Sequence, residues 1–332
     1  MKYLTGFAAL LLLAACSGDP GAGPILIEAE KVALYPDAPE RLDVGALEYR
    51  GGLVLASPDE RFGGLSGMEI EGGRLLAISD SAYWLTAHLE FDDAGMLTGL
   101  SNAFYAPILD ANGQALVDRA ADAEGLAALG NGAYAVSFER EHRMARYDIS
   151  PDWSGVAIAT PTPITPPPGT DRLRDNGGIE GLASADYGLW AGVEYPIIDG
   201  RPHTLWVMPD DGEATGLPYP AEPGFGVTGL DRGPDGDIYL LERIYISGVG
   251  NTIRIMRFDE FGLETEDQRS NIDTLAILTP DMTVDNFEGI AIGEVNGEMR
   301  LFILSDDNYN PGQRTLLLSF AFAEGRIGSD SQ

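Results

Sequence analysis

Cysteine, lysine and histidine are scarce in this chain of 332 residues. The single cysteine is Cys16, the two lysines are Lys2 and Lys31, and there are three histidines. A lone cysteine excludes a disulfide framework, and so few cysteine and histidine side chains argue against a zinc site. Any metal that this chain binds is therefore expected to be a hard cation with oxygen ligands.

Positive charge is also in short supply. Lysine and arginine total 21 against 52 aspartates and glutamates, which gives a net charge of −31. Such a field repels phosphate backbones and anionic membranes and attracts divalent cations, so nucleic acid is not an expected partner. Two simpler causes stay open: acidic charge improves the solubility of exported proteins, and a GC-rich genome enriches arginine over lysine.

The only long hydrophobic run lies at the N-terminus. Lys2 precedes the apolar residues 7–14, and small residues lead up to Cys16. The run is too short to span a bilayer and resembles a bacterial lipoprotein signal, in which cleavage leaves the cysteine acylated. We therefore expect a signal peptide at residues 1–15, a flexible tether at 16–24 and a lipid anchor that places the protein on the periplasmic face of the outer membrane. A plain secretory signal with an incidental cysteine is the alternative.

Long amphipathic helices are absent from the pattern, which instead repeats a pair of short strands. Each copy opens with a polar residue followed by glycine and an apolar residue, turns, and ends in an apolar strand followed by an acid. The opening residues are Ser66, Glu124, Glu180, Thr228 and Glu288. Successive copies begin roughly 50 residues apart, which is typical of four-stranded β-propeller blades.

The repeats predict an all-β fold, a β-propeller with five or six four-stranded blades, over residues 25–332. The first repeat shows its strands most plainly, at residues 65–70, 74–79, 84–91 and 100–107. N-terminal strands at 25–34, 46–49 and 53–56 are expected to close the ring with the strand at 315–322, because closure removes exposed sheet edges. In the second repeat we expect a strand at 156–160, followed by a stiff proline-rich connection at 161–168.

An acid repeated at one register in every blade forms a ring around the propeller axis, because the innermost strands line the central channel. The acids that end the repeats are Asp80, Glu139, Glu194, Glu242 and Asp306, and Glu124, Glu180 and Glu288 open them. Carboxylates this close cannot all stay ionised without a cation, and flexible oxygen ligands suit Ca²⁺. The expected Ca²⁺ ligands are Asp80, Glu124, Glu180, Glu194, Glu242, Glu288 and Asp306. The alternative is that these acids accept hydrogen bonds from backbone amides and hold no metal.

Basic side chains next to these acids form a second pattern. Arg140, Arg143 and Arg243 follow closely after acids of the ring. Guanidinium groups at the same mouth are expected to bind an anionic substrate, with Asn308 as a further polar contact. His142 is the histidine in a site-like context. Each arginine could instead only neutralise the adjacent glutamate.

Several of these motifs together resemble one known family. They are residues 62–67, 79–80, 122–126, 137–143 and 176–182. Over roughly residues 42–322 the chain is similar to the bacterial phytase-like family, also described as "esterase-like activity of phytase". The resemblance implies a β-propeller and phosphomonoester hydrolysis assisted by Ca²⁺. β-Propeller phytases have lysine-rich and arginine-rich phosphate pockets, so the two lysines of this chain argue against phytate itself.

The sequence thus favours a hydrolase of phosphate or other esters, acting on a small anionic substrate as a lipid-anchored monomer. Glu180, Glu139 and His142 are the expected catalytic residues, with Glu180 accepting the proton of the attacking water. A non-catalytic binding or assembly propeller of the cell envelope and a lactonase-like hydrolase are the alternatives that the sequence leaves open.

Overall fold

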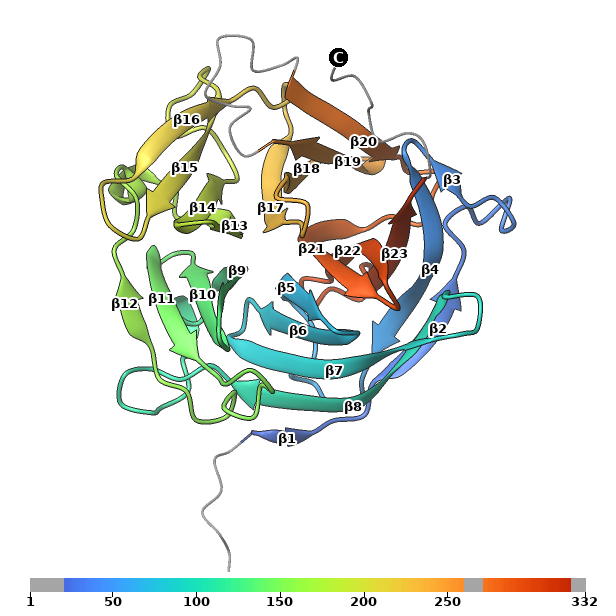
Figure 1. Cartoon of the computed structure of the whole chain (residues 1–332), viewed down its shortest axis with the longest axis horizontal. Coiled ribbons are helices and arrows are strands. Elements are labelled where there is room, and N and C mark those ends of the chain that lie inside the picture. The colour runs from blue at the N-terminus through green and yellow to red at the C-terminus, as the bar shows by residue number, and fades with distance from the viewer. Residues whose placement is uncertain (1–20, 260–270, 324–332) are drawn as a thin grey trace, which may run out of the picture.

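The protein is a five-bladed β-propeller, with its blades arranged around a central axis (Figure 1). The computed structural model describes residues 21–259 and 271–323. The all-β prediction is confirmed, and the blade number is five. The expected signal peptide and Cys16 lie outside the described residues. Within the described ranges, no helix has the length and apolarity of a membrane-spanning segment.

The first two blades follow the predicted strand pattern closely. Blade 1 contains β5 (Leu65–Glu71), β6 (Arg74–Ser79), β7 (Tyr83–Phe91) and β8 (Leu97–Pro107), with β1 (Gly23–Pro24) on its outer edge. Blade 2 contains β9 (Ala123–Gly130), β10 (Ala133–Phe138), β11 (Arg143–Asp148) and β12 (Thr162–Ile164).

The outer strand of blade 2 differs from the prediction. Residues 156–158 form a turn and 159–160 are irregular, whereas β12 lies inside the proline-rich segment and pairs with β11. Pro163 is tolerated there because an edge strand needs a backbone donor on only one side.

The third and fourth blades are four-stranded sheets. Blade 3 contains β13 (Ile179–Ala185), β14 (Gly188–Val193), β15 (His203–Pro209) and β16 (Thr215–Tyr219). Blade 4 contains β17 (Gly226–Arg232), β18 (Ile238–Ile246), β19 (Gly250–Phe258) and β20 (Ile272–Leu278). Two short 3₁₀ helices, Asp118–Ala120 and Thr170–Arg172, lie in the connections that enter blades 2 and 3.

Blade 5 joins the two ends of the chain, as the sequence predicts. It combines β21 (Asn286–Val295), β22 (Glu298–Asp306) and β23 (Thr315–Phe322) with β4 (Leu47–Ala56) from the N-terminal part. β2 (Glu28–Val32) and β3 (Asp43–Val44) pair with β4. The ring is therefore closed by hydrogen bonds between β4 and β23, and no blade is left with an open seam.

The glycine in each opening motif is required by the close approach of neighbouring blades. A Cβ added at Gly229 would lie 2.3 Å from the carbonyl oxygen of Glu288, and one at Gly125 would lie 3.0 Å from the carbonyl oxygen of Glu180. No larger residue fits there without moving the inner strands apart. The glycine of the repeated motif thus lies at the contact that sets the distance between neighbouring inner strands.

Apolar side chains of the inner strands close the channel along the axis. Met68, Leu126, Leu182, Leu230 and Ile290, one from each blade, lie at this level, where a space of only about 10 Å³ remains. These residues form the floor of a cavity that opens at the end of the propeller where the inner strands begin. We call this end the cup end.

Candidate functional site

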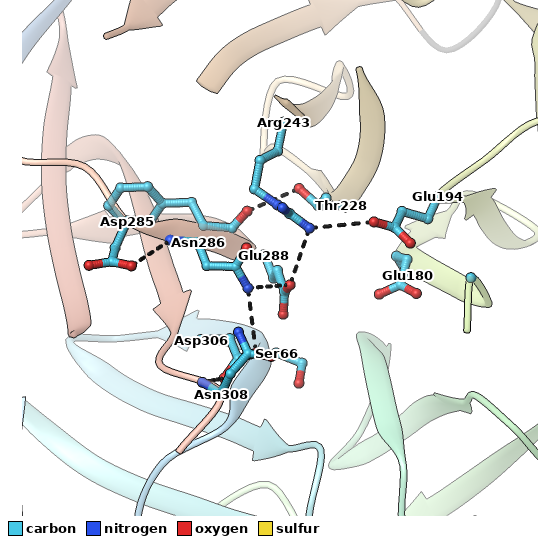
Figure 2. Close-up of polar contacts among 12 residues, drawn as sticks. Ser66, Glu180, Glu194, Thr228, Arg243, Asp285, Asn286, Glu288, Asp306 and Asn308 are labelled. Atoms are coloured by element: carbon cyan, nitrogen blue, oxygen red, sulfur yellow. Dashed lines mark hydrogen bonds and ion pairs between the residues drawn. The ribbon is translucent and has the colours of Figure 1, made fainter. Parts of the chain in front are cut away.

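An acidic cavity of about 270 Å³ occupies the cup end of the channel, and we call it the cup. Its lining contains eight carboxylates and two arginines: Asp80, Asp122, Glu124, Glu139, Arg140, Asn176, Glu180, Glu194, Tyr195, Arg243, Asn286, Glu288, Asp306 and Asn308. Figure 2 shows the part of the cup that blades 3, 4 and 5 form. Acids from sequence positions more than 200 residues apart therefore share one small space, as the repeat pattern predicts.

The opening residues of the repeats form the first ring of the cup. Glu124 and Glu180 are the second residues of β9 and β13, and Glu288 is the third residue of β21. All three line the cavity. Blades 1 and 4 have hydroxyl residues, Ser66 and Thr228, at the same register. The Ser66 hydroxyl donates to the Gly64 carbonyl at 3.2 Å, and the Thr228 hydroxyl donates to the Phe287 carbonyl at 3.1 Å.

Residues at the cup end of the second strands form the second ring, but blade 4 breaks the predicted pattern. Asp80, Glu139, Glu194 and Asp306 line the cup, whereas the fourth blade contributes Arg243 in place of Glu242. The pairing of Val227 with Glu242 matches that of Phe287 with Ser305, so Arg243 is the counterpart of Asp306. The expected place of Glu242 in the ring is therefore corrected: side chains alternate along a strand, and a shift of one residue turns Glu242 to the other face.

Glu242 is instead part of an ion pair inside blade 4. Its carboxylate accepts a hydrogen bond from Tyr219 at 2.8 Å and one from Arg254 at 2.5 Å, and it is almost fully buried. Replacement by glutamine leaves Arg254 without its buried partner, so we expect Glu242→Gln to lower the free energy of unfolding by about 3 kcal/mol. Urea unfolding measures this loss. The calcium response of the variant should equal that of the wild type, and a lost response would return Glu242 to the cation site.

Some lining residues were missed by the sequence prediction. Asp122 and Asn286 lie two positions before Glu124 and Glu288, and both line the cup. The other three repeats have glycine at this position, so the register carries only a weak signal for Asp122 and Asn286. Asn176 and Tyr195 belong to connections around blade 3, and no repeat pattern marks them.

Arg243 is the central cation of the cup. One Nη lies 3.4 Å from Glu194 and 3.6 Å from Glu288, and the Nε is buried with no hydrogen-bond partner among the described residues (Figure 2). Asn286 donates to Glu288 at 2.7 Å and reaches Asp306 at 3.5 Å. Arg243 thus neutralises one side of the cup and keeps a donor available.

Arg140 is the second arginine of the cup, while its predicted neighbours lie elsewhere. Its Nε is 2.7 Å from the Asp122 carboxylate, and its backbone is left-handed, with φ of 51°. The chain turns at this residue, so Arg143 packs over the Phe138 ring at 3.8 Å and donates to the Ala120 carbonyl.

His142 also lies outside the cup. Its Nε2 is 2.9 Å from the carbonyl oxygen of Arg174. Neither His142 nor Arg143 lines the cavity, which corrects their expected placement beside the substrate.

A loop from blade 5 fixes the position of Asp80 in blade 1. Asp306 accepts the backbone N–H of Asn308 at 2.6 Å, and Asp307 accepts the N–H of Gly64 at 3.0 Å. Gly64 has a φ of +60°, and a Cβ there would lie 2.1 Å from the Asp80 carboxylate. Asn308 lines the cup as predicted, because this loop turns inward at the seam between blades 5 and 1.

Burial raises the pKa of the cup carboxylates. Burial, with added repulsion from Glu288 and Asp80, raises the pKa of Asp306 to about 9. Burial is also the main cause that raises the pKa of Asp80 to about 6 and the pKa of Glu139 to about 7. Burial and then neighbouring glutamates hold the pKa of Glu124 and of Glu180 well above the usual range. Without a cation, the cup therefore retains protons at neutral pH.

These raised pKa values predict that the metal-free protein loses stability as pH rises. The unfolded carboxylates ionise near pH 4, whereas Asp80, Glu139 and Asp306 in the folded protein ionise near 6, 7 and 9. The folded state binds more protons than the unfolded state across this window. The contribution of these groups to the free energy of unfolding is therefore fully present below about pH 4 and is lost as pH rises to about 9. Melting in EDTA at several pH values measures the trend. Asp306→Asn should reduce the fall in melting temperature at alkaline pH. An unchanged slope would contradict the raised pKa of Asp306.

Three acids at one side of the cup are close enough to share one cation. Asp122, Glu124 and Glu139 each offer a carboxylate oxygen, and these atoms lie within 4.8 Å of one another. Two of the three belong to the predicted rings, and Asp122 is the addition that the structure reveals. The cup thus offers a metal only oxygen donors.

A five-bladed propeller with a carboxylate-lined cup at one end is the class of protein that the fold and the cavity define. The family model "Phytase-like: Esterase-like activity of phytase" matches residues 60–309. The chain belongs to this phytase-like family, as its motifs predict.

Two solved structures are similar to the chain at low sequence identity. An α-L-arabinofuranosidase from Podospora anserina has 12% identity and a TM-score of 0.50, covering 83% of this chain and 97% of that chain. A gluconolactonase from Xanthomonas campestris has 13% identity and a TM-score of 0.41, covering 91% of this chain and 98% of that chain. At 12% identity the similarity to the arabinofuranosidase concerns the fold alone. No curated protein matches the chain.

Proposed function

We propose that this propeller is a calcium-dependent hydrolase of small anionic esters, with phosphate monoesters as the foremost substrates. The observation that carries the proposal is the cup itself, where eight carboxylates and two arginines line about 270 Å³. A purely structural role needs no such concentration of buried acids, because each one costs free energy to bury. The phytase-like family supports ester hydrolysis as the reaction class.

Calcium is the cation that the donors fit best. The side chains of the cup that can ligate a metal present carboxylate, amide and phenol oxygens, with no cysteine or histidine among them. Ca²⁺ accepts six to eight such oxygens in flexible geometry, whereas Zn²⁺ prefers nitrogen and sulfur. Asp122, Glu124 and Glu139 would hold it, with further oxygens from substrate and water.

When bound, Ca²⁺ would polarise an ester oxygen and acidify a water molecule. Arg243 and Arg140 would bind the anionic group of the substrate and offset the charge that develops on it. Glu180, whose Oε1 accepts the Gly178 N–H at 3.2 Å, would receive the proton of the attacking water at its other oxygen. Asn308 would orient the substrate from the opposite wall, and the apolar floor excludes water from below.

The proposal includes the lipid anchor that the sequence predicts. Acylation at Cys16 would hold the propeller on the periplasmic face of the outer membrane, with the tether leading into β1. Its substrate is then an ester that occurs in the cell envelope, and nucleic acid is not a partner.

Hydrolysis assays on the purified protein test this function. An aryl phosphate, an aryl carboxylate ester and a sugar lactone are offered separately with added Ca²⁺, with Mg²⁺ and with EDTA. We expect calcium-dependent hydrolysis of the phosphate ester. Hydrolysis of the lactone alone would support the lactonase-like alternative, and no hydrolysis of any substrate would support a non-catalytic propeller.

A further inference from the structure

Exposed apolar side chains gather at the cup end of the propeller. Among the described residues, six of the ten exposed large hydrophobic side chains lie in segments there: Val117, Ile198, Tyr245, Ile246, Val249 and Tyr309. Only Ile158 and Tyr187 lie at the opposite end, and the remaining two lie along blade edges. Tyr245, Ile246 and Val249 lie within five residues of one hairpin, and exposed apolar side chains grouped in this way mark an interaction surface.

The hairpin of blade 4 contributes half of these side chains. The second strands of blades 1, 2 and 3 end immediately before their cup acids, but β18 continues to Ile246, three residues beyond Arg243. The tip of this longer hairpin exposes 62% of Tyr245 and 61% of Val249. The chain thus extends apolar groups past the mouth of the cup.

The N-terminal tether enters the fold at the same end. Arg61, in the connection that precedes β5, donates to the carbonyl oxygen of Gly21 at 2.6 Å, and its own carbonyl accepts the Tyr309 hydroxyl at 3.2 Å. Four residues separate Cys16 from Gly21, and the five steps between the two residues span at most about 18 Å. An acyl chain on Cys16 would therefore hold the cup end close to the bilayer.

The charge at the cup end favours a zwitterionic bilayer surface over an anionic one. Two exposed arginines outside the cup are paired, Arg119 with Asp175 and Arg174 with Asp199, whereas Arg172 and Arg201 form no ion pair among the described residues. The eight carboxylates of the cup still outnumber these cations. An anionic surface would be repelled, whereas zwitterionic lipids present ammonium groups to the carboxylates.

We infer that the cup end docks on a zwitterionic membrane surface, with the blade 4 hairpin inserted at the level of the headgroups. The orientation rests on the proposed lipid anchor and on the exposed side chains, and it does not depend on the proposed hydrolysis. Together, the docking and the proposed hydrolysis place the cup against the membrane, where its substrates are esters of lipid headgroups.

The full chain with Cys16→Ser, which has no acyl chain and no other cysteine, tests the docking. Tyr245→Cys and, as the matched control, Tyr187→Cys are each added and labelled with a polarity-sensitive fluorophore. Vesicles of phosphatidylcholine and phosphatidylethanolamine should shift the emission of the label at 245 to the blue and leave that at 187 unchanged. Equal responses, or no response at 245, would overturn the inference.

A second variant set measures the contribution of the hairpin. Tyr245→Ser, Ile246→Ser and Val249→Ser together should reduce vesicle-bound protein at least about tenfold, whereas Ile158→Ser with Tyr187→Ser should not. Unchanged binding by the triple variant, or preference for anionic phosphatidylglycerol vesicles, would contradict the assignment. Hydrolysis of a soluble aryl phosphate should be the same in the triple variant. Arg243→Gln should reduce hydrolysis and retain vesicle binding, so failure of one proposal is distinguishable from failure of the other.

Discussion

Glu124→Gln is expected to remove most of the stabilisation by calcium and to lower ester hydrolysis at least about 100-fold. Glu124 is one of three acids, with Asp122 and Glu139, whose carboxylate oxygens lie within 4.8 Å of one another and can share one ion. At a calcium concentration 100 times the Kd, binding stabilises the wild type by about 2.7 kcal/mol. If the lost ligand weakens binding about 100-fold, only about 0.4 kcal/mol remains.

Melting with and without calcium measures this difference, and hydrolysis is followed in the same buffer. Glu90→Gln is the matched control, because Glu90 is an exposed carboxylate on β7, far down blade 1. It should leave both readouts unchanged. A Glu124→Gln variant with the calcium response of the wild type would place the cation elsewhere.

Arg243→Gln should have opposite effects on calcium binding and on hydrolysis. The guanidinium lies beside Glu194 and Glu288, so its loss makes the cup more negative and should tighten calcium binding. The same loss removes a donor to the anionic substrate, which should lower hydrolysis about 100-fold. Tighter calcium with slower hydrolysis is not expected from simple misfolding.

Arg243→Lys is the conservative control for this prediction. Lysine keeps the charge but lacks the planar fork, so calcium affinity should remain near that of the wild type while hydrolysis recovers only in part. Calorimetric titration and initial rates measure the two quantities. Equal losses of both in Arg243→Gln would mean that Arg243 only stabilises the fold.

The architecture could be predicted because every blade has the same packing requirements. Each blade needs a glycine where inner strands approach, as at Gly125 and Gly229, and each needs an apolar second strand. These requirements recur in the sequence at the period of a blade. The strands of blade 1 and the closure by β4 and β23 were both predicted, the closure because it removes exposed sheet edges.

The cup was predictable only in part, because a spacing in sequence does not fix the face on which a side chain lies. The spacing that placed Glu242 in the ring was wrong by one residue, and in a strand one residue reverses the side chain. The left-handed backbone at Arg140 likewise turns His142 and Arg143 away, and no sequence pattern signals that turn. Asp122 shares its register with only one other polar residue, Asn286, and Tyr195 belongs to no repeat, so neither was predicted.

Direct titration of calcium into the metal-free protein tests the central claim, that the converging carboxylates hold a divalent cation. Protein dialysed against EDTA and then into metal-free buffer at pH 8 is titrated with Ca²⁺ in a calorimeter. We expect saturable binding that releases protons, since the raised pKa values leave the empty cup partly protonated. No heat of binding and no proton release, in a protein shown to be folded, would contradict it.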